Sequence, residues 1–169
     1  EVLVNLLAGA TVPDRGEVRV LGQSTADITT GSAWLEALDH LGIITERAVL
    51  LDQLTVEQNL AVPLSLDLYD LPASLRRDVA ALASEVGLDP AQLPAFLSTL
   101  PPLDRMRVRL ARALAVRPRL VMAEHPNAAL DAGDRPVFAA DLVRVAAARR
   151  LALLVMTADA VPRLLWIQR

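Results

Sequence analysis

The chain has 169 residues, 53% of them apolar and 22% charged, which is enough for one domain with a buried core and excludes a disordered protein. The net charge of −3 provides no general attraction to nucleic acid, and the lack of cysteine excludes disulfides and thiolate chemistry. All seventeen basic residues are arginine, so no lysine chemistry is available, and His40 and His125 are too few for a zinc cluster.

No apolar run approaches the roughly 18 to 20 residues that cross a bilayer, and no secretory signal pattern stands at the N-terminus. The sequence begins inside an apolar helical pattern, without a methionine or a capping residue. We therefore expect a soluble, cytoplasmic protein whose start lies further upstream.

In the N-terminal half, apolar residues at helical spacing over 3–10 predict a helix that ends in a turn at 12–16. Apolar and charged residues alternate over 17–21, which is typical of a half-buried strand, and the short apolar run 41–45 predicts a buried strand. Capping-box spacing predicts that a helix starts near Thr55.

In the C-terminal half, helical and buried-strand patterns alternate. They are a helix over 105–118 with Val108, Leu110 and Leu114 inside, a strand over 119–123, a helix over 136–150, a strand over 151–157 and an edge strand over 163–168. This alternation predicts a parallel sheet with helices on its faces. The short helices from about 53 to 106 interrupt it and predict a separate subdomain.

Polar residues follow three of the predicted strands, at 45–46, 123–125 and 157–159. The carboxyl ends of parallel strands carry the chemistry of open α/β sheets, so these residues should line one rim. Taken alone the pattern is weak, because Glu124 could equally be a solvated turn carboxylate and His125 a plain loop residue.

Four segments occur in the order and spacing of ATP-binding-cassette domains: 5–22, 50–64, 107–118 and 120–131. On these residues the chain resembles the nucleotide-binding subunit of an ABC transporter over essentially its whole length. The resemblance implies an α/β fold with a RecA-like P-loop NTPase core and a mainly parallel sheet, formed by 1–52 and 107–169, and a helical subdomain over 53–106.

The resemblance also implies ligands and partners. These are ATP with Mg²⁺, a second cassette domain in a homo- or heterodimer, and a membrane permease that holds the chain on the inner face of the cell membrane. The permease-docking groove would be lined by Val49, Leu50, Leu51 and Leu54. Neither nucleic acid nor a resident metal cluster is expected.

The catalytic motifs of the family are degenerate in this chain. No G-x-x-x-x-G-K-[ST] phosphate loop occurs, so the loop either lies upstream of Glu1 or has been lost. Ala123 stands where the family has its magnesium aspartate, and a methyl group cannot orient a metal-bound water. Glu124 matches the general base that polarises the attacking water.

Most of the remaining motif positions also differ from the residues that the family has there. Glu46 replaces the glutamine that senses the γ-phosphate, Ala158 replaces the switch histidine, and Asp131 is retained. The signature motif, which closes over the partner's ATP, corresponds to Leu100, Pro101, Pro102, Leu103 and Asp104. Two prolines and a leucine remove the hydroxyl and the close-approach amides that would bind phosphate.

The arginines from 105 to 119 could form a nucleic-acid stripe, but they lack interleaved aromatics and spread around the helix. We expect a solvated helix with local ion pairs. In a second interpretation Arg105 or Arg107 offsets the charge of Glu46 or of a phosphate.

Removing one charge-stabilising donor costs roughly 100- to 1,000-fold in rate, so the combined losses predict impaired or absent hydrolysis. The first hypothesis is therefore a transporter subunit that retains the cassette fold. The alternatives are a slow but active ATPase that drives export of lipid, lipoprotein-like or small amphipathic substrates with an intact phosphate loop upstream, and a soluble non-catalytic scaffold.

Overall fold

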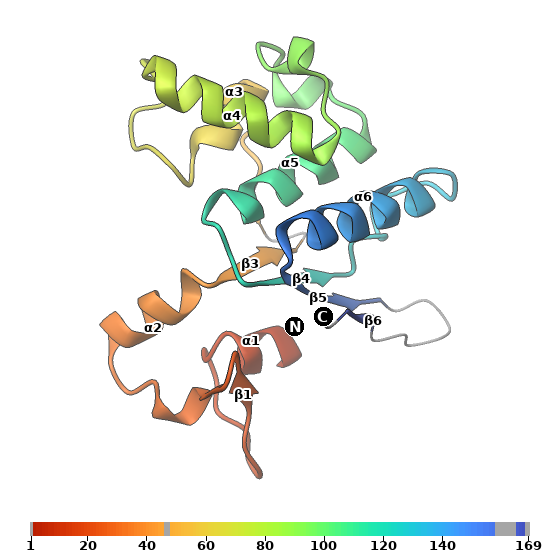
Figure 1. The fold of residues 1–169 in the computed structure, drawn as a ribbon. Coiled ribbons are helices and arrows are strands. Elements are labelled where there is room, and N and C mark those ends of the chain that lie inside the picture. The colour runs from red at the N-terminus through yellow and green to blue at the C-terminus, as the bar shows by residue number, and fades with distance from the viewer. Residues whose placement is uncertain (1, 46–47, 158–164, 168–169) are drawn as a thin grey trace.

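The computed structural model describes residues 2–45, 48–157 and 165–167 (Figure 1). Its helices are α1 (Val2–Leu7), α2 (Gly31–Leu38), α3 (Val56–Ala61), α4 (Ala73–Val86), α5 (Pro102–Ala115) and α6 (Asp134–Arg149), with 3-10 turns η1 (Thr25–Asp27), η2 (Pro90–Gln92) and η3 (Leu97–Thr99). Its strands are β1 (Arg19–Val20), β2 (Gln23–Ser24), β3 (Leu41–Ile44), β4 (Leu120–Glu124), β5 (Ala152–Met156) and β6 (Leu165–Ile167).

The central sheet has the strand order β3-β4-β5-β6. The first three strands are parallel, and β6 pairs antiparallel with β5, so the prediction of a mainly parallel sheet with an edge strand near the C-terminus is confirmed. The register aligns Ile44, Ala123 and Val155, and the three parallel strands therefore end at one rim. β1 and β2 form a separate short antiparallel pair.

Helices cover both faces of the sheet, with α5 and α6 on one side and α1 with the β1-β2 pair on the other (Figure 1). Strand residues alternate accordingly: Met122 and Leu154 pack with Val4 of α1, whereas Val121 and Leu153 belong to the larger core that includes α5 and α6. The strands are apolar on both faces because both faces are covered.

Gly42 in β3 shows how closely α5 approaches the sheet. A Cβ atom at this position would lie 2.8 Å from the backbone oxygen of Ala113 and 3.0 Å from the Pro118 side chain. The missing side chain therefore sets the distance between β3 and the C-terminal half of α5.

A helical unit, formed by α3, α4, η2 and η3, packs above the sheet against α5. The predicted start of α3 is confirmed, since Thr55 and Gln58 form both hydrogen bonds of a capping box. α5 is one continuous helix across the predicted boundary between 106 and 107, so it belongs to the helical unit at its start and to the sheet at its end.

The sequence pattern missed residues 23–40 and overestimated the strand predicted over 17–21, of which only Arg19 and Val20 pair as β1. α2 has only eight residues and no fully buried one, so it is too short for apolar periodicity to identify it. Thr30 caps it instead, accepting from the Ala33 amide at 3.2 Å, and Trp34 anchors it by donating from Nε1 to the Ala8 carbonyl at 3.0 Å.

No helix within the described residues combines the length and apolar character needed to cross a bilayer.

Candidate functional site

The predicted rim is present at the carboxyl ends of β3, β4 and β5. Thr45 follows β3 and donates from its hydroxyl to Glu124 Oε2 at 3.3 Å, across a sequence separation of 79 residues. Glu124 is the last residue of β4 and pairs in register with Met156, next to Thr157. The polar residues that sequence spacing assigned to one rim therefore lie on adjacent strands.

Ala123 directly precedes Glu124 but lies on the opposite side of the strand. Its side chain is fully buried in the larger core, which also contains Ile44 and Val121. A methyl group offers no oxygen ligand, and among the described residues no group of three or more His, Asp or Glu could hold a metal ion. The rim therefore has one carboxylate from β4, and residue 123 contributes no metal ligand beside it.

The Glu124 carboxyl is half-buried and accepts a hydrogen bond from the Thr45 hydroxyl. A hydrogen bond of this kind favours the ionised form of a carboxyl group. An ionised carboxylate can accept a proton from water or hold a water molecule in place, which are the actions of a general base.

The loop after β4 turns sharply at His125, which has a left-handed φ of 47° and donates its amide to the Met156 carbonyl at 2.8 Å. Its side chain is exposed, as expected for a loop residue. Asp131 is also exposed, and its backbone oxygen accepts from the amides of Asp134 and Arg135 at the start of α6. Glu46 and Ala158 lie outside the described residues.

The start of α5 contains the positions matched to the signature motif. Leu100 is buried, whereas Pro101 and Pro102 are exposed and begin the helix without a side-chain cap. Proline has no amide hydrogen, so position 102 has no donor to offer a phosphate. Asp104 points into the protein, where it accepts from Gln92 Nε2 at 2.9 Å and from Arg107 Nη1 at 3.0 Å.

The α5 arginines form local ion pairs, as the sequence suggested. Arg105 bonds Asp52 at 2.7 Å, and Arg107 bonds Asp141 at 2.9 Å as well as Asp104. Burial alone would lower the pKa of Arg107, but these two carboxylates raise its pKa. In this structure both guanidinium groups are therefore engaged by neighbouring carboxylates.

The four residues expected to line a permease groove differ in exposure. Leu50 and Leu54 are core residues at 9% exposure, Leu51 is half-buried, and Val49 is 69% exposed. Asn59, fully buried, donates from Nδ2 to the Leu51 carbonyl and accepts from the Leu51 amide, so it fixes the shape of this segment.

Arg112 attaches the same segment to α5. Its Nη1 donates to the Val49 carbonyl at 2.7 Å, and burial lowers the pKa of its guanidinium. Val49 and Leu51 therefore form the accessible part of the predicted groove, on a backbone fixed from two sides.

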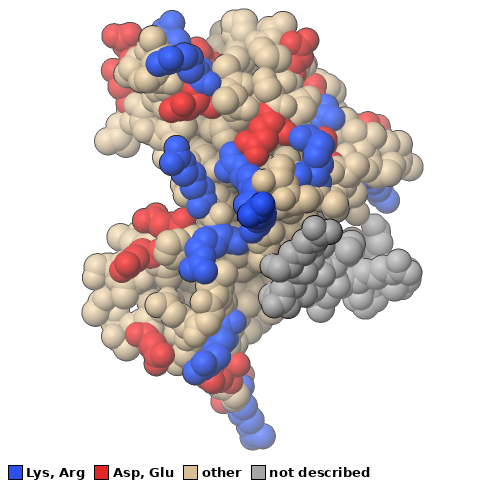
Figure 2. Space-filling model, in the orientation of Figure 1, with Lys and Arg blue, Asp and Glu red and all other residues tan. Residues whose placement is uncertain are grey.

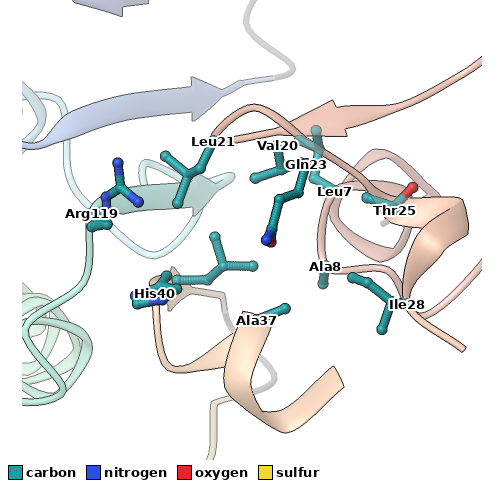
Figure 3. Close-up of a pocket in the computed structure, with 11 residues that line it drawn as sticks. Leu7, Ala8, Val20, Leu21, Gln23, Thr25, Ile28, Ala37, His40 and Arg119 are labelled. Carbon is teal, nitrogen blue, oxygen red and sulfur yellow. The ribbon is translucent and has the colours of Figure 1, made fainter. Parts of the chain in front are cut away.

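A cavity of about 150 Å³ lies at the opposite edge of the sheet, near the amino ends of β3 and β4 (Figure 3). Gln23 points into it, and His40 and Arg119 stand at its margin above a floor that includes Leu41. Leu41 begins β3 and Arg119 precedes β4, so this cavity is separated by the strand length from Glu124.

Comparison with known proteins agrees with this architecture. The sequence profile of the ABC transporter family matches residues 2–128. The lipoprotein-releasing system ATP-binding protein LolD of Alcanivorax borkumensis is 35% identical over 129 residues, which cover 76% of this chain and 56% of the relative. LolD of Psychrobacter arcticus is 31% identical over 159 residues, covering 93% of this chain and 69% of the relative.

Solved structures show the same fold. The ATP-binding cassette MJ0796, in a dimeric post-hydrolysis state with ADP and Pi, gives a TM-score of 0.73 at 22% identity, over 94% of this chain and 69% of the other. The cbiO1 structure from Clostridium perfringens gives a TM-score of 0.80 at 17% identity, over 94% and 62%.

The chain thus spans between about half and two thirds of the length of these relatives. The profile match covers most of its residues, and the fold superposes on the solved cassettes with TM-scores of 0.73 and 0.80. The chain belongs to the ABC transporter family and has the α/β, RecA-like fold of its ATP-binding cassette domain.

Proposed function

We propose that this chain is a cassette subunit of a membrane transporter whose own strand-end rim hydrolyses ATP weakly or not at all. The subunit pairs with a second cassette domain, which supplies the missing chemistry, and docks on a membrane permease at the inner face of the cell membrane. ATP with Mg²⁺ is the ligand that the family binds.

Ala123 is the observation that carries the proposal. Hydrolysis of ATP requires a metal ion that neutralises charge on the transferred phosphoryl group, and a magnesium ion is held in protein sites by carboxylates. The alanine methyl group is fully buried and contributes no ligand beside Glu124. The general base remains while its neighbouring metal ligand is absent.

The start of α5 supports the same conclusion from the other half of a paired site. A cassette that closes over its partner's nucleotide needs hydroxyl and amide donors there, and the exposed residues are Pro101 and Pro102. Asp104 is held inside by Gln92 and Arg107, and its charge would in any case repel a phosphate.

We propose that the permease contacts Val49 and Leu51, because these are the accessible residues of the segment that Asn59 and Arg112 fix. Two of the relatives are named for lipoprotein release, which makes lipoproteins or similar amphipathic molecules the transported class we favour.

A slow but active ATPase is the second candidate, because the Glu124 carboxylate is ionised and hydrogen-bonded by Thr45 in the position of a general base. Magnesium-dependent release of phosphate from ATP, measured on the purified protein and on Glu124→Gln, separates the two. Under the first proposal both proteins release phosphate at or slightly above the rate of a blank, and Glu124→Gln does not change that rate. Activity that disappears in Glu124→Gln would establish the second candidate.

Partner and nucleotide binding need a separate measurement. Co-purification with a permease from detergent extracts, followed by the loss of that permease in Val49→Asp, would support the docking contact. A protein that stays soluble without any membrane partner, and whose fractionation is unchanged by Val49→Asp, would favour a scaffold.

A further inference from the structure

Charged side chains gather where the helical unit meets the sheet unit, and neither catalysis nor permease docking uses them. We name this cluster the junction and define it by Glu85 of α4, Arg107 of α5, and Asp141, Arg144 and Arg149 of α6. Figure 2 shows acidic and basic side chains lying next to one another in the upper half of the molecule.

Glu85 and Arg149 form the strongest contact of the junction. Arg149 donates from Nε to Oε1 at 2.6 Å and from Nη2 to Oε2 at 2.5 Å, which is a bidentate pair across 64 residues of sequence. The two side chains are about three-quarters buried, at 27% and 25% exposure. Bidentate arginine–carboxylate pairs fix geometry as well as adding energy.

Three helices meet at this pair. Nη1 of Arg149 donates to the carbonyl of Leu114 near the end of α5 at 2.8 Å, so one guanidinium bonds α4 and α5 from α6. Arg144, one turn earlier on α6, donates to the backbone oxygen of Glu85 at 2.7 Å. The C-terminal turn of α4 is therefore held at both its side chain and its backbone.

Asp141 extends the junction toward the start of α5. It accepts from Arg107 at 2.9 Å and from Arg144 at 2.9 Å, and its side chain is only 12% exposed. Gly87 ends α4 in a left-handed conformation, and a Cβ atom there would lie 3.4 Å from Arg107 Nε. The end of α4 is thus packed directly on a guanidinium that α6 holds in place.

The position of Glu85 argues against an incidental surface pair. A carboxylate in the last turn of a helix opposes the helix dipole, whose C-terminal end is negative, and the last turn of α4 contains no basic residue to compensate. Isolated exposed ion pairs contribute little, but this one is largely buried, bidentate and shared among three helices. The contacts with α6 explain the position of Glu85, and the sequence of α4 alone does not.

We infer that Glu85, with Arg149 and Arg144, forms a latch that holds the helical unit in one orientation on the sheet. The latch acts between α4 and α6, so it sets where α3 and α4 stand relative to the strand-end rim. It depends on no nucleotide, and its test is independent of whether the chain hydrolyses ATP.

The distance between α4 and α6 measures the latch directly. The chain contains no cysteine, so spin labels on Ser74→Cys and Ala139→Cys, both exposed positions on these helices, report a single distance by pulsed electron paramagnetic resonance. The parent should give one narrow distribution. In Glu85→Gln the population outside the main peak should rise roughly tenfold, because the charge that orients Arg149 is lost.

Asp78→Asn is the matched control, since Asp78 is an exposed carboxylate on the same helix, and its distribution should superimpose on that of the parent. Arg149→Gln removes the other half of the bidentate pair and should broaden the distribution as Glu85→Gln does. This second variant decides the question even if Glu85→Gln folds poorly. Superimposable distributions for the parent, Glu85→Gln and Arg149→Gln would overturn the latch.

Discussion

The strand-end rim and the three-helix junction use polar residues in opposite ways. At the strand-end rim and at the start of α5, Ala123, Pro101 and Pro102 offer no side-chain ligand to metal or phosphate. At the junction, Asp141 accepts from Arg107 and Arg144, and Glu85 accepts from Arg144 and Arg149. The first region has few groups that could bind metal or phosphate, whereas the second pairs each carboxylate with arginine.

This difference indicates which functional requirement the chain still meets. Hydrolysis requires oxygen ligands at the rim, whereas assembly with a partner requires that the helical unit and the sheet unit keep a defined relative orientation. A cassette retained for its surfaces would lose the first set of residues and keep the second. Changes in each region therefore test the comparison.

Restoring the carboxylate as Ala123→Asp should have the largest effect. Position 123 is fully buried in the larger core, so an added carboxylate has no solvent and no partner, and the free energy of unfolding should fall by about 4 kcal/mol. Chemical denaturation measures the change.

The same substitution at the exposed position Ala139 is the control and should cost less than about 0.5 kcal/mol. Mg²⁺ with ATP should restore part of the stability of Ala123→Asp if the aspartate gains a metal to bind. Equal stability of the two variants would mean that the rim is open to water at residue 123, contrary to the packing described above.

Asn59→Ala should lower the free energy of unfolding by about 3 kcal/mol, because it leaves the Leu51 amide without its buried acceptor and removes one of the two donors to each of the Leu51 and Thr55 carbonyls. Gln53→Ala, an exposed amide on the same segment, should be nearly neutral. A small effect at Asn59 would show that the segment holding Val49 keeps its shape without this side chain, and the proposed docking surface would lose its support.

Asp141→Ala should cost about 2 kcal/mol. It removes one of two carboxylates from Arg107 and one partner from Arg144, while Asp104 still compensates Arg107. Thermal unfolding measures the loss, with Asp78→Asn as the exposed control. If Asp141→Ala leaves the stability unchanged, the junction is stabilised by the apolar contacts between α4, α5 and α6. The contrast with the rim would then weaken.

The fold could be predicted from the sequence wherever the pattern of apolar residues is clear. Apolar runs over 119–123 and 151–157 and the helix with Val108, Leu110 and Leu114 inside are all confirmed. Residues 23–40 were missed because α2 is only eight residues long and is held by the Thr30 cap and the Trp34 hydrogen bond.

The sequence predicted which positions lie at the candidate site, but not which side chains contact one another there. Strand ends placed Glu124 beside Thr45, yet nothing in the spacing indicates that Asp104 turns inward to Gln92 and Arg107. The latch could not be predicted from the sequence either. Glu85 and Arg149 lie 64 residues apart, and the pattern around each is typical of an ordinary surface charge. Side-chain pairs of this kind are set by how helices pack, and that packing depends on the whole core.

Glu124→Gln should have the smallest effect and is the most direct test of the rim. The substitution keeps the shape of the side chain and an oxygen that can accept from Thr45, so the free energy of unfolding should change by less than about 0.5 kcal/mol at neutral pH. If the rim is catalytically silent, phosphate release from ATP is also unchanged, and the pair formed with an active partner cassette hydrolyses ATP at the parent's rate. A fall of 100-fold or more in that assembled activity, the size expected for a lost general base, would show that Glu124 still works within the pair. The rim would then take part in hydrolysis without a carboxylate at residue 123, and the contrast between the rim and the junction would no longer hold.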